Sequence, residues 1–406
     1  MQKNKLPQIK GVKNMKKINS KKIIFSAFVV LIVLIVGVLV FTNLSNKEKK
    51  NIQTDVSPIT GDIVLTNPSN EETIEIGAIL PLTGTTAFAG EALKNGALLA
   101  VDEINAKGGI DGKMVKLIIE DSKSAPAEGV NAFNNLELKK PDVVISAMAS
   151  VSAAVIPIAN TTETPIIATV ATSPQLITEY DNAYRYFPTA KQEIPPIIEI
   201  ANEKGIKKMG IIYLNDEFGA AMFSTLTEEF DGEVIGESFL ISNTDYSTSI
   251  LKLKEAKVDG ILVVGFSSHI SKCIQQIKEY NLDVVIFAPS TSAFPDIRNT
   301  LGSEEIYAGI PSFYNTESSN PATKFKEDYK AKYGKDADHY AATGYDTVML
   351  IKKAIEEGSA NREGIINGLN KIKVYSGIFG DVTKDGREFG FNLYPAEVSK
   401  EKISFE

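Results

Sequence analysis

The chain has 406 residues, of which 43% are hydrophobic and 23% charged, a composition typical of globular proteins and a length that suits two domains. Its net charge of −8 argues against nucleic-acid binding as the main activity, because neutralising phosphates requires a basic surface. The one cysteine, Cys273, cannot form an internal disulfide and has no metal-site spacing around it, so we expect it to pack in a core.

The N-terminus carries a membrane signal. Eight lysines lie within residues 1–22, and residues 23–41, IIFSAFVVLIVLIVGVLVF, contain no charged side chain. As a helix rising about 1.5 Å per residue, this run nearly spans a hydrocarbon core of about 30 Å. It exceeds the usual signal-peptide core of about 7–15 residues, and no small-residue cleavage site or lipid-accepting cysteine follows. These features favour an uncleaved signal anchor over a long cleaved signal peptide, with residues 1–22 in the cytoplasm and residues 42–72 as a linker outside.

From residue 73 onward, short β-branched runs alternate with amphipathic helical patterns. Strands separated by helices of about 10–15 residues predict βαβ units and a mostly parallel sheet. In this first half we predict strands at 73–80, 114–121, 142–147 and 164–170, and helices at 90–109, at 125–140 and from about 148 to about 160.

The same alternation starts again after YRYFPTAKQEIPP, which predicts a second lobe of the same kind. Near the end of the chain, GIFGDVTKDGREFGFNLYPAEV is typical of a β-hairpin around Lys384-Asp385-Gly386. In this second half we predict strands at 207–214, 233–241, 259–266 and 283–289, and helices at 218–230, 249–256, 267–281, 320–334 and 341–358.

Motifs for catalysis are missing from the sequence. A serine nucleophile needs a base, and the two histidines, His269 and His339, have neither a GxSxG nor an HExxH context. The run KGGIDGK lacks the spacing of a phosphate loop, and no GxGxxG follows the first strand. We therefore expect a protein that is not an enzyme and that uses no cofactor or metal.

Hydroxyl-rich turns follow three of the predicted strands, in PLTGTTAFAG, SAMASVSA and ATVATSP. In open α/β sheets, ligands bind beyond the carboxyl ends of the strands, where helix N-termini present free amides. Hydroxyls and amides together suit an anionic group such as a carboxylate. Each turn alone is more typical of helix capping, but their recurrence at equivalent strand ends favours a shared ligand pocket.

The stretch IEIGAILPLTGTTAFAGEALKNGALLAVDEINAKGGIDGKMVKLIIEDSKSAP strongly resembles the opening of the leucine/isoleucine/valine-binding proteins, which are substrate-binding components of ABC transporters. The resemblance continues through ISAMASVSAAVIPIA, PIIATVATSPQLIT, IIYLNDEFGAAM and NTDYSTSILKLKEAKVDGILVVGF to the last hairpin, over roughly residues 73–400. It implies an α/β, type I periplasmic-binding-protein fold, with two lobes of parallel sheets flanked by helices and a cleft that closes on ligand. Mapped onto this chain, lobe one is 73–189 with 317–373, and lobe two is 190–316 with 374–406.

The resemblance also implies ligand-binding residues. Ser150 and Thr172 match the family's serine and threonine that bind a ligand carboxylate, with a backbone amide near Val170. Aromatic walls of the cleft match three phenylalanines, where the family often carries tyrosine, so we expect a more apolar pocket; plain core packing is the alternative for them. We also expect Tyr345 to border the cleft. The three phenylalanines are Phe88, Phe218 and Phe266.

One position departs from the family pattern. The family's acidic ligand for an α-ammonium group falls at Ser290 in IFAPSTSAF. A neutral hydroxyl cannot balance a buried cation, whose desolvation is costly without a partner. Either another acid takes this role, with Asp121 and Asp346 as candidates, or the ligand lacks an ammonium group.

Taken together, the sequence predicts a single-pass membrane protein whose binding domain lies on the periplasmic or extracellular side. We expect it to capture a branched-chain or other amino acid, or a similar small carboxylate or amide, and to deliver it to an ABC transporter permease. The alternative is the ligand-binding module of a sensory receptor.

Overall fold

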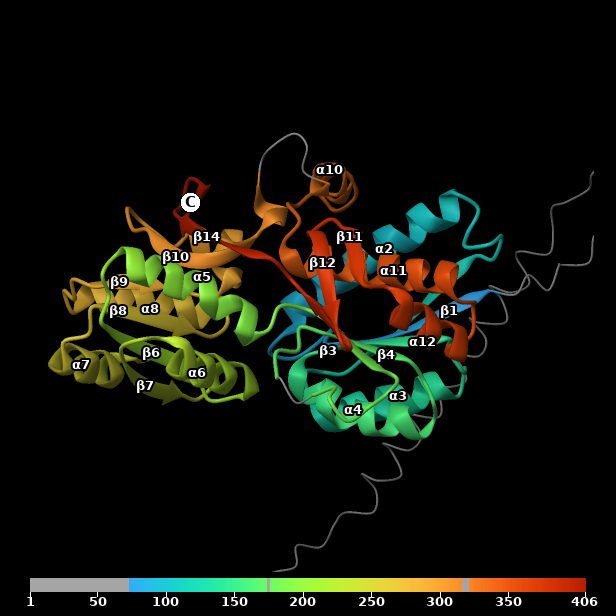
Figure 1. Ribbon diagram of the computed structural model, residues 1–406, viewed down its shortest axis with the longest axis horizontal. Coiled ribbons are helices and arrows are strands. Elements are labelled where there is room, and N and C mark those ends of the chain that lie inside the picture. The colour runs from blue at the N-terminus through green and yellow to red at the C-terminus, as the bar shows by residue number, and fades with distance from the viewer. Residues whose placement is uncertain (1–72, 174–175, 316–320) are drawn as a thin grey trace, which may run out of the picture. The chain divides into compact units, whose positions relative to one another are not determined.

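The computed structural model describes residues 73–173, 176–315 and 321–406, which form two α/β lobes, each built on one sheet (Figure 1). The predicted cytoplasmic segment, membrane anchor and linker, at 1–22, 23–41 and 42–72, lie outside the described residues. Among the helices that the structure describes, none is long and apolar enough to cross a bilayer.

Lobe one contains a parallel core of five strands in the order β2–β1–β3–β4–β5. All five residues of β3, VVISA, are buried, as expected for a parallel strand covered on both faces. The strands are β1 (Ile74–Leu80), β2 (Val115–Asp121), β3 (Val143–Ala147), β4 (Ile166–Thr169) and β5 (Ala183–Tyr186).

Helices cover both faces of this sheet, with α3 and α4 on one side and α2, α11 and α12 on the other (Figure 1). Helices α2 and α11 approach closely because glycine faces backbone at their contact. A Cβ at Gly96 would lie 1.8 Å from the carbonyl oxygen of Ala341, and one at Gly344 would lie 2.1 Å from that of Leu93. The helices of this lobe are α2 (Ala87–Ala106), α3 (Pro126–Glu137), α4 (Ala149–Thr161), α10 (Ala322–Tyr333), α11 (His339–Glu357) and α12 (Arg362–Lys371).

Lobe two repeats this order with β7–β6–β8–β9–β10, and antiparallel β14 and β15 extend it. Adjacent residues of β6 face opposite cores: Ile211 packs with α5 and α6, and Ile212 packs with α7 and α8. Cys273 on α8 is buried in the second of these cores, which confirms its prediction as a core residue. The strands are β6 (Lys208–Leu214), β7 (Glu233–Phe239), β8 (Gly260–Val264), β9 (Val285–Phe287), β10 (Ile306–Pro311), β14 (Leu393–Val398) and β15 (Ile403–Phe405). The helices are α5 (Ala190–Glu203), α6 (Glu217–Glu229), α7 (Ser247–Ala256), α8 (Ser267–Glu279) and the short α9 (Pro295–Arg298).

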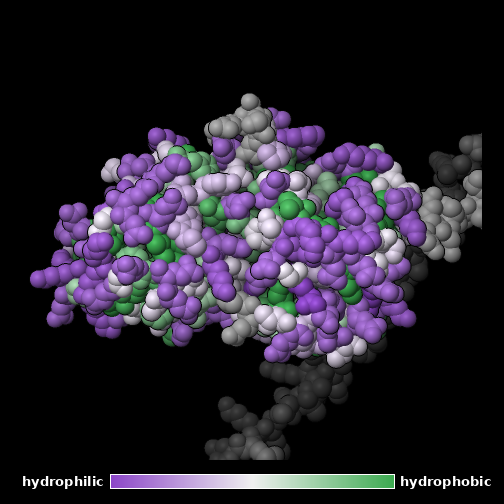
Figure 2. Space-filling view, in the orientation of Figure 1, coloured by the Kyte–Doolittle hydropathy of each residue, from purple (hydrophilic) through white to green (hydrophobic). Residues whose placement is uncertain are grey.

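The large apolar side chains of both lobes lie mainly in these cores. The face seen in Figure 2 is accordingly mostly hydrophilic, with hydrophobic residues scattered between the polar ones.

The predicted hairpin near the C-terminus is present, as β12 (Gly380–Asp385) and β13 (Glu388–Gly390), preceded by β11 (Val374–Gly377). The assignment of this segment to lobe two is wrong, because β13 pairs with β5 of lobe one. Glu388 also forms an ion pair with the buried Arg185 of β5. The chain therefore returns to lobe two only at β14, and residues 374–390 complete the first sheet.

A buried carboxylate on α11 attaches this segment to lobe one. Asp346 accepts hydrogen bonds from the hydroxyls of Tyr186, at 2.9 Å, and Tyr375, at 3.2 Å. It also accepts from the backbone N–H of Ile378, at 3.1 and 3.0 Å to its two oxygens. Burial raises the pKa of Asp346 to about 6, although these hydrogen bonds oppose the shift. The aspartate is thus a structural acceptor inside lobe one.

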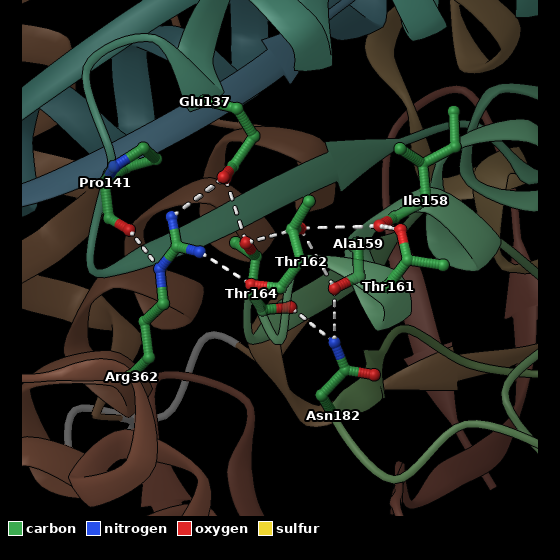
Figure 3. A network of polar contacts seen from close by, with 9 residues as sticks. All are labelled: Glu137, Pro141, Ile158, Ala159, Thr161, Thr162, Thr164, Asn182 and Arg362. Carbon is green, nitrogen blue, oxygen red and sulfur yellow. Dashed lines mark hydrogen bonds and ion pairs between the residues drawn. The ribbon is translucent and has the colours of Figure 1, made fainter.

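The amino ends of three lobe-one strands are joined by a polar network (Figure 3). Arg362 of α12 donates from Nη2 to both carboxylate oxygens of Glu137, at 2.9 and 3.1 Å, and from Nε to the carbonyl of Pro141 before β3, at 3.1 Å. Asn182, before β5, donates to the carbonyl of Thr164, before β4, at 2.6 Å. These contacts connect the amino ends of the strands through polar side chains. They lie at the edge of the sheet opposite the carboxyl ends of the strands.

Asp346→Ala is expected to lower the free energy of unfolding by about 3 kcal/mol or more. The change leaves the Tyr186 hydroxyl and the backbone amide of Ile378 buried without an acceptor, and each such group costs roughly 1–3 kcal/mol. Chemical denaturation of the full-length protein measures the effect. Asp385→Ala removes an exposed carboxylate near the turn of the hairpin and should change stability by less than about 0.5 kcal/mol. Equal stability of the two variants would contradict the attachment described above.

Candidate functional site

A cavity of about 270 Å³ is lined by residues of both lobes. This volume lies just below the roughly 300–1,000 Å³ typical of pockets for drug-sized ligands, and so suits a small solute. Nearly all of its lining residues directly follow the carboxyl ends of strands, from β1 to β5 in lobe one and from β6 to β9 in lobe two. The exceptions are Glu193 on α5 and Tyr340 on α11.

The strand order explains this position. In a sheet ordered 2-1-3-4-5, the chain moves in opposite directions from the first strand, which opens a crevice at the carboxyl ends of strands one and three. Both sheets have this order in their parallel cores. Each sheet therefore has such a crevice, and each lobe contributes one wall of the cavity.

The turn between β3 and α4 presents one serine to the cavity. Ser146 and Ser152 are fully buried, and their hydroxyls bond each other at 2.8 Å. Ser150, the second residue of α4, lines the cavity next to the free amides of the helix N-terminus. Within the described residues its hydroxyl makes no hydrogen bond, so it can donate to a ligand. The sequence-predicted Ser150 therefore lies at the cavity wall, and its two neighbours do not.

The turn after β4 brings Val170 and Thr172 to the same cavity. Val170 has a φ of 50°, a left-handed conformation that is rare for a β-branched residue. Met148, which precedes Ser150 in the neighbouring turn, also has a positive φ, of 76°. Such conformations cost roughly 1–3 kcal/mol and persist where the surrounding structure imposes them, often at ligand sites. Residues of both strained turns line the cavity.

Aromatic side chains form the opposing wall. Phe218, near the start of α6, and Phe266, just before α8, both line the cavity as predicted from the sequence. His269 supports Phe266, because its Nδ1 accepts from the Phe266 N–H at 3.3 Å. The proton is then on Nε2, which donates to the carbonyl of Ile241 at 3.0 Å. Burial lowers the pKa of His269, so the ring is neutral and structural.

Three of the predicted site residues do not line this cavity. Phe88 lies on an adjoining one, 42% exposed, with its ring centroid 6.3 Å from that of Phe266. Tyr345 lies elsewhere in lobe one, where its hydroxyl donates to Glu103 at 2.5 Å. Ser290 is 1% exposed and bonds Glu193.

The two acids proposed from the sequence for a ligand ammonium group also lie elsewhere. Asp346 belongs to the hairpin attachment, and Asp121 holds the loop after β1 by accepting from the Leu82 N–H at 2.9 Å. Sequence reasoning missed Glu193, which lines the cavity. A signal was available in the pattern Thr189-x-x-Gln192, a capping box that predicts a helix start here, and the Gln192 side chain does accept from the Thr189 N–H at 2.8 Å.

Glu193 is only 3% exposed and is held by Ser290. The Ser290 hydroxyl donates to its Oε1 at 2.6 Å, and the Ser290 backbone N–H donates to its Oε2 at 2.9 Å. Burial raises the pKa of Glu193 to about 7, more than these two hydrogen bonds lower it. No cluster of three or more His, Cys, Asp or Glu side chains in the described part of the chain is placed to hold a metal ion.

Comparison with known proteins shows the family of the chain. A family model described as periplasmic binding protein matches residues 73–402. A Leu/Ile/Val-binding protein of Rhizobium johnstonii is 27% identical over 80% of this chain and 92% of its own length. A leucine-, isoleucine-, valine-, threonine- and alanine-binding protein of Pseudomonas aeruginosa is 24% identical over 80% of this chain and 90% of its own.

Solved structures share the fold. The branched-chain amino acid transporter substrate-binding protein LivJ of Streptococcus pneumoniae, in complex with isoleucine, superposes with a TM-score of 0.74 at 26% identity, over 82% of this chain and 98% of that one. An ABC transporter solute-binding protein of R. palustris, in complex with benzoate, superposes with a TM-score of 0.72 at 18% identity, over 82% and 95%.

The fold, the cavity and the family match thus define a two-lobed solute-binding protein. The chain belongs to the periplasmic-binding-protein family, and the resemblance to the leucine/isoleucine/valine-binding proteins of type I is confirmed.

Val170→Gly and Val234→Gly should both lower the free energy of unfolding, and we expect the loss for Val170→Gly to be smaller by about 1–2 kcal/mol. Only Val170→Gly releases the strain of a positive φ angle. Both valines are half-buried, and Val234 lies in the ordinary strand β7. Urea denaturation of the two variants beside the wild type gives the comparison. Equal losses of stability would show that the backbone at Val170 carries no strain.

Proposed function

We propose that the protein is the extracytoplasmic substrate-binding component of an ABC transporter, binding a branched-chain or other amino acid, or a similar small carboxylate, and delivering it to a permease. The observation that carries this proposal is the cavity itself. One wall has hydroxyls and a helix N-terminus, and the other has Phe218 and Phe266. The first wall suits an anionic group and the second suits an apolar side chain. The isoleucine complex of the S. pneumoniae relative supports the same ligand class.

In this proposal the ligand carboxylate lies against lobe one. It accepts from the hydroxyls of Ser150 and Thr172 and from backbone amides of the strained turns near Val170. Such charge-assisted hydrogen bonds are each worth roughly 1.5–3 kcal/mol. The apolar part of the ligand contacts Phe218 and Phe266, and Phe88 lies at the outer edge of the site.

Capture is expected to couple to closure of the lobes. The chain passes between the two sheets three times, between β5 and α5, after β10 and between β13 and β14. Hinges of two-lobed binding proteins consist of such short connecting segments. A ligand that contacts both walls binds best when the lobes close on it, and this difference in affinity drives the motion.

The proposal also includes a membrane tether. Residues 23–41, with the lysines before them, would keep the binding domain at the outer face of the membrane, close to the permease.

Ser150→Ala and Thr172→Ala are each expected to weaken binding by about tenfold to a hundredfold, since each removes one hydrogen bond to the ligand carboxylate. Isothermal titration with leucine, isoleucine and valine measures the affinities. Ser224→Ala, on the exposed side of α6, is the control and should bind as the wild type does. Unchanged affinity in both site variants would overturn the carboxylate assignment.

Deleting residues 1–42 is expected to release the protein from the membrane fraction, whereas deleting residues 46–70 should leave it there. N-terminal sequencing of the membrane-bound protein should find a start before residue 23. A mature N-terminus near residue 43 would instead show that the apolar segment is a cleaved signal peptide.

A further inference from the structure

The cavity has an acidic lining. Among the described residues that line it, three carry carboxylates, Glu193, Asp216 and Glu217, and none is a lysine, arginine or histidine. A cavity built only to receive an anion would repel it with these groups. The charge of the lining therefore indicates that part of the ligand is cationic.

Two of the three carboxylates are less suited to bind a ligand cation, because one caps a helix and the other is exposed. Asp216 is the N-cap of α6, where its Oδ1 accepts from the Gly219 N–H at 2.9 Å. Glu217 is exposed to solvent. Glu193 alone is almost completely buried, and it comes from the first turn of α5, directly after the chain crosses between the lobes.

Glu193 has hydrogen-bond donors but no cationic partner among the described residues. Ser290 occupies one lone pair on each carboxylate oxygen, which fixes the group in place and leaves further acceptor capacity on both oxygens. A buried carboxylate without a cation is costly, and this cost is what raises its pKa. A cation arriving in the cavity would offset it.

Aromatic rings beside Glu193 also favour a cation. Phe187 and Tyr340 line the same cavity, with their rings stacked at 6.3 Å between centroids. Aromatic faces attract ammonium groups. Burial, followed by the nearby carboxylates of Asp338 and Glu193, raises the pKa of Tyr340 far above its ordinary value, so its hydroxyl stays neutral.

We propose that Glu193 is the residue that binds an ammonium group of the ligand, with Ser290 as the residue that positions it. This inference rests on the proposed function and narrows its ligand class. The expected ligand class narrows from small carboxylates in general to amino acids, which carry a carboxylate for the wall of Ser150 and an ammonium group for Glu193. The acidic role moves from the position of Ser290 to a side chain that Ser290 holds.

Two measurements on the full-length wild-type protein, purified in detergent, test the inference without any variant. The first compares the amino acid that binds most tightly among the twenty common ones with the acid in which hydrogen replaces its amino group, such as 4-methylpentanoate for leucine. We expect the amino acid to bind at least tenfold more tightly. The second follows its affinity from pH 8 to pH 5. Below the pKa of Glu193, binding must displace a proton, so affinity should fall by up to about tenfold per pH unit.

Variants identify the residue. Glu193→Gln keeps the shape of the side chain and removes its charge. We expect this variant to bind the amino acid at least tenfold more weakly than the wild type and to bind the deaminated acid no more weakly. Its affinity for the amino acid should also change less between pH 8 and pH 5. Glu199→Gln, an exposed glutamate on the same helix, is the matched control and should match the wild type in all three respects.

Stability separates a ligand-binding role from a structural one. The pKa of Glu193 in the folded protein, about 7, exceeds the ordinary glutamate value of about 4.5, so the ligand-free protein should lose stability as pH rises from about 4.5 to about 7. Removing the charge should therefore leave ligand-free Glu193→Gln at least as stable as the wild type at pH 8, as thermal unfolding can show. A carboxylate that only ties α5 to the turn after β9 would give the opposite result.

The outcomes distinguish this inference from the proposed function. If the deaminated acid binds as tightly as the amino acid, or if Glu193→Gln binds the amino acid as the wild type does, Glu193 is not the ammonium site and the proposed function stands. If only carboxylates without an ammonium group bind, Glu193 is likewise not an ammonium site and the proposed function stands. If no amino acid and no small carboxylate binds, the proposed function itself fails and this inference fails with it.

Discussion

Parallel strands bring their carboxyl ends to one edge of a sheet, and the rest of the site depends on this constraint. Turns far apart in the sequence, after β1, β3 and β4, meet along one edge of lobe one, and those after β6, β8 and β9 meet along one edge of lobe two. Helix N-termini start at the same edge and supply free amides. The opposite edge of the first sheet carries the network of Arg362, Glu137 and Asn182, which joins strand ends and lines no part of the cavity (Figure 3).

Two buried carboxylates show how environment decides the role of one chemical group. Asp346 is surrounded by donors, two tyrosine hydroxyls and backbone amides, and serves the architecture of lobe one. Glu193 receives donors from Ser290 alone and lies against a cavity. Burial raises the pKa of both, but the oxygens of Asp346 are occupied by donors of the protein, whereas those of Glu193 keep acceptor capacity beside the cavity. A perturbed carboxyl group therefore indicates binding only together with acceptor capacity that a ligand can reach.

Particular residues show which predictions local patterns could support. Ser150, Thr172 and Phe266 directly follow strands that the sequence predicts, and the family resemblance singled them out; all three line the cavity. Tyr345 lies mid-helix on α11, where the direction of a side chain depends on how the helix packs, and it points to Glu103 instead. Helix α5 is absent from the predicted elements; Pro195 and Pro196, which usually interrupt a helix, lie inside it, and Glu193 lies on its first turn.

The sequence by itself determined the alternation of strands and helices, the two lobes and the hydroxyl-rich turns of Ser150 and Thr172, because hydrophobic periodicity and strand-end turns are local properties. Only the tertiary structure decided that residues 374–390 join lobe one, since pairing of β13 with β5 connects segments about two hundred positions apart. It likewise placed a buried acid, Glu193, at the cavity. Glu193 and Ser290 are 97 positions apart. The packing of α5 within lobe two brings them into contact beside a cavity, and no local sequence pattern predicts this contact.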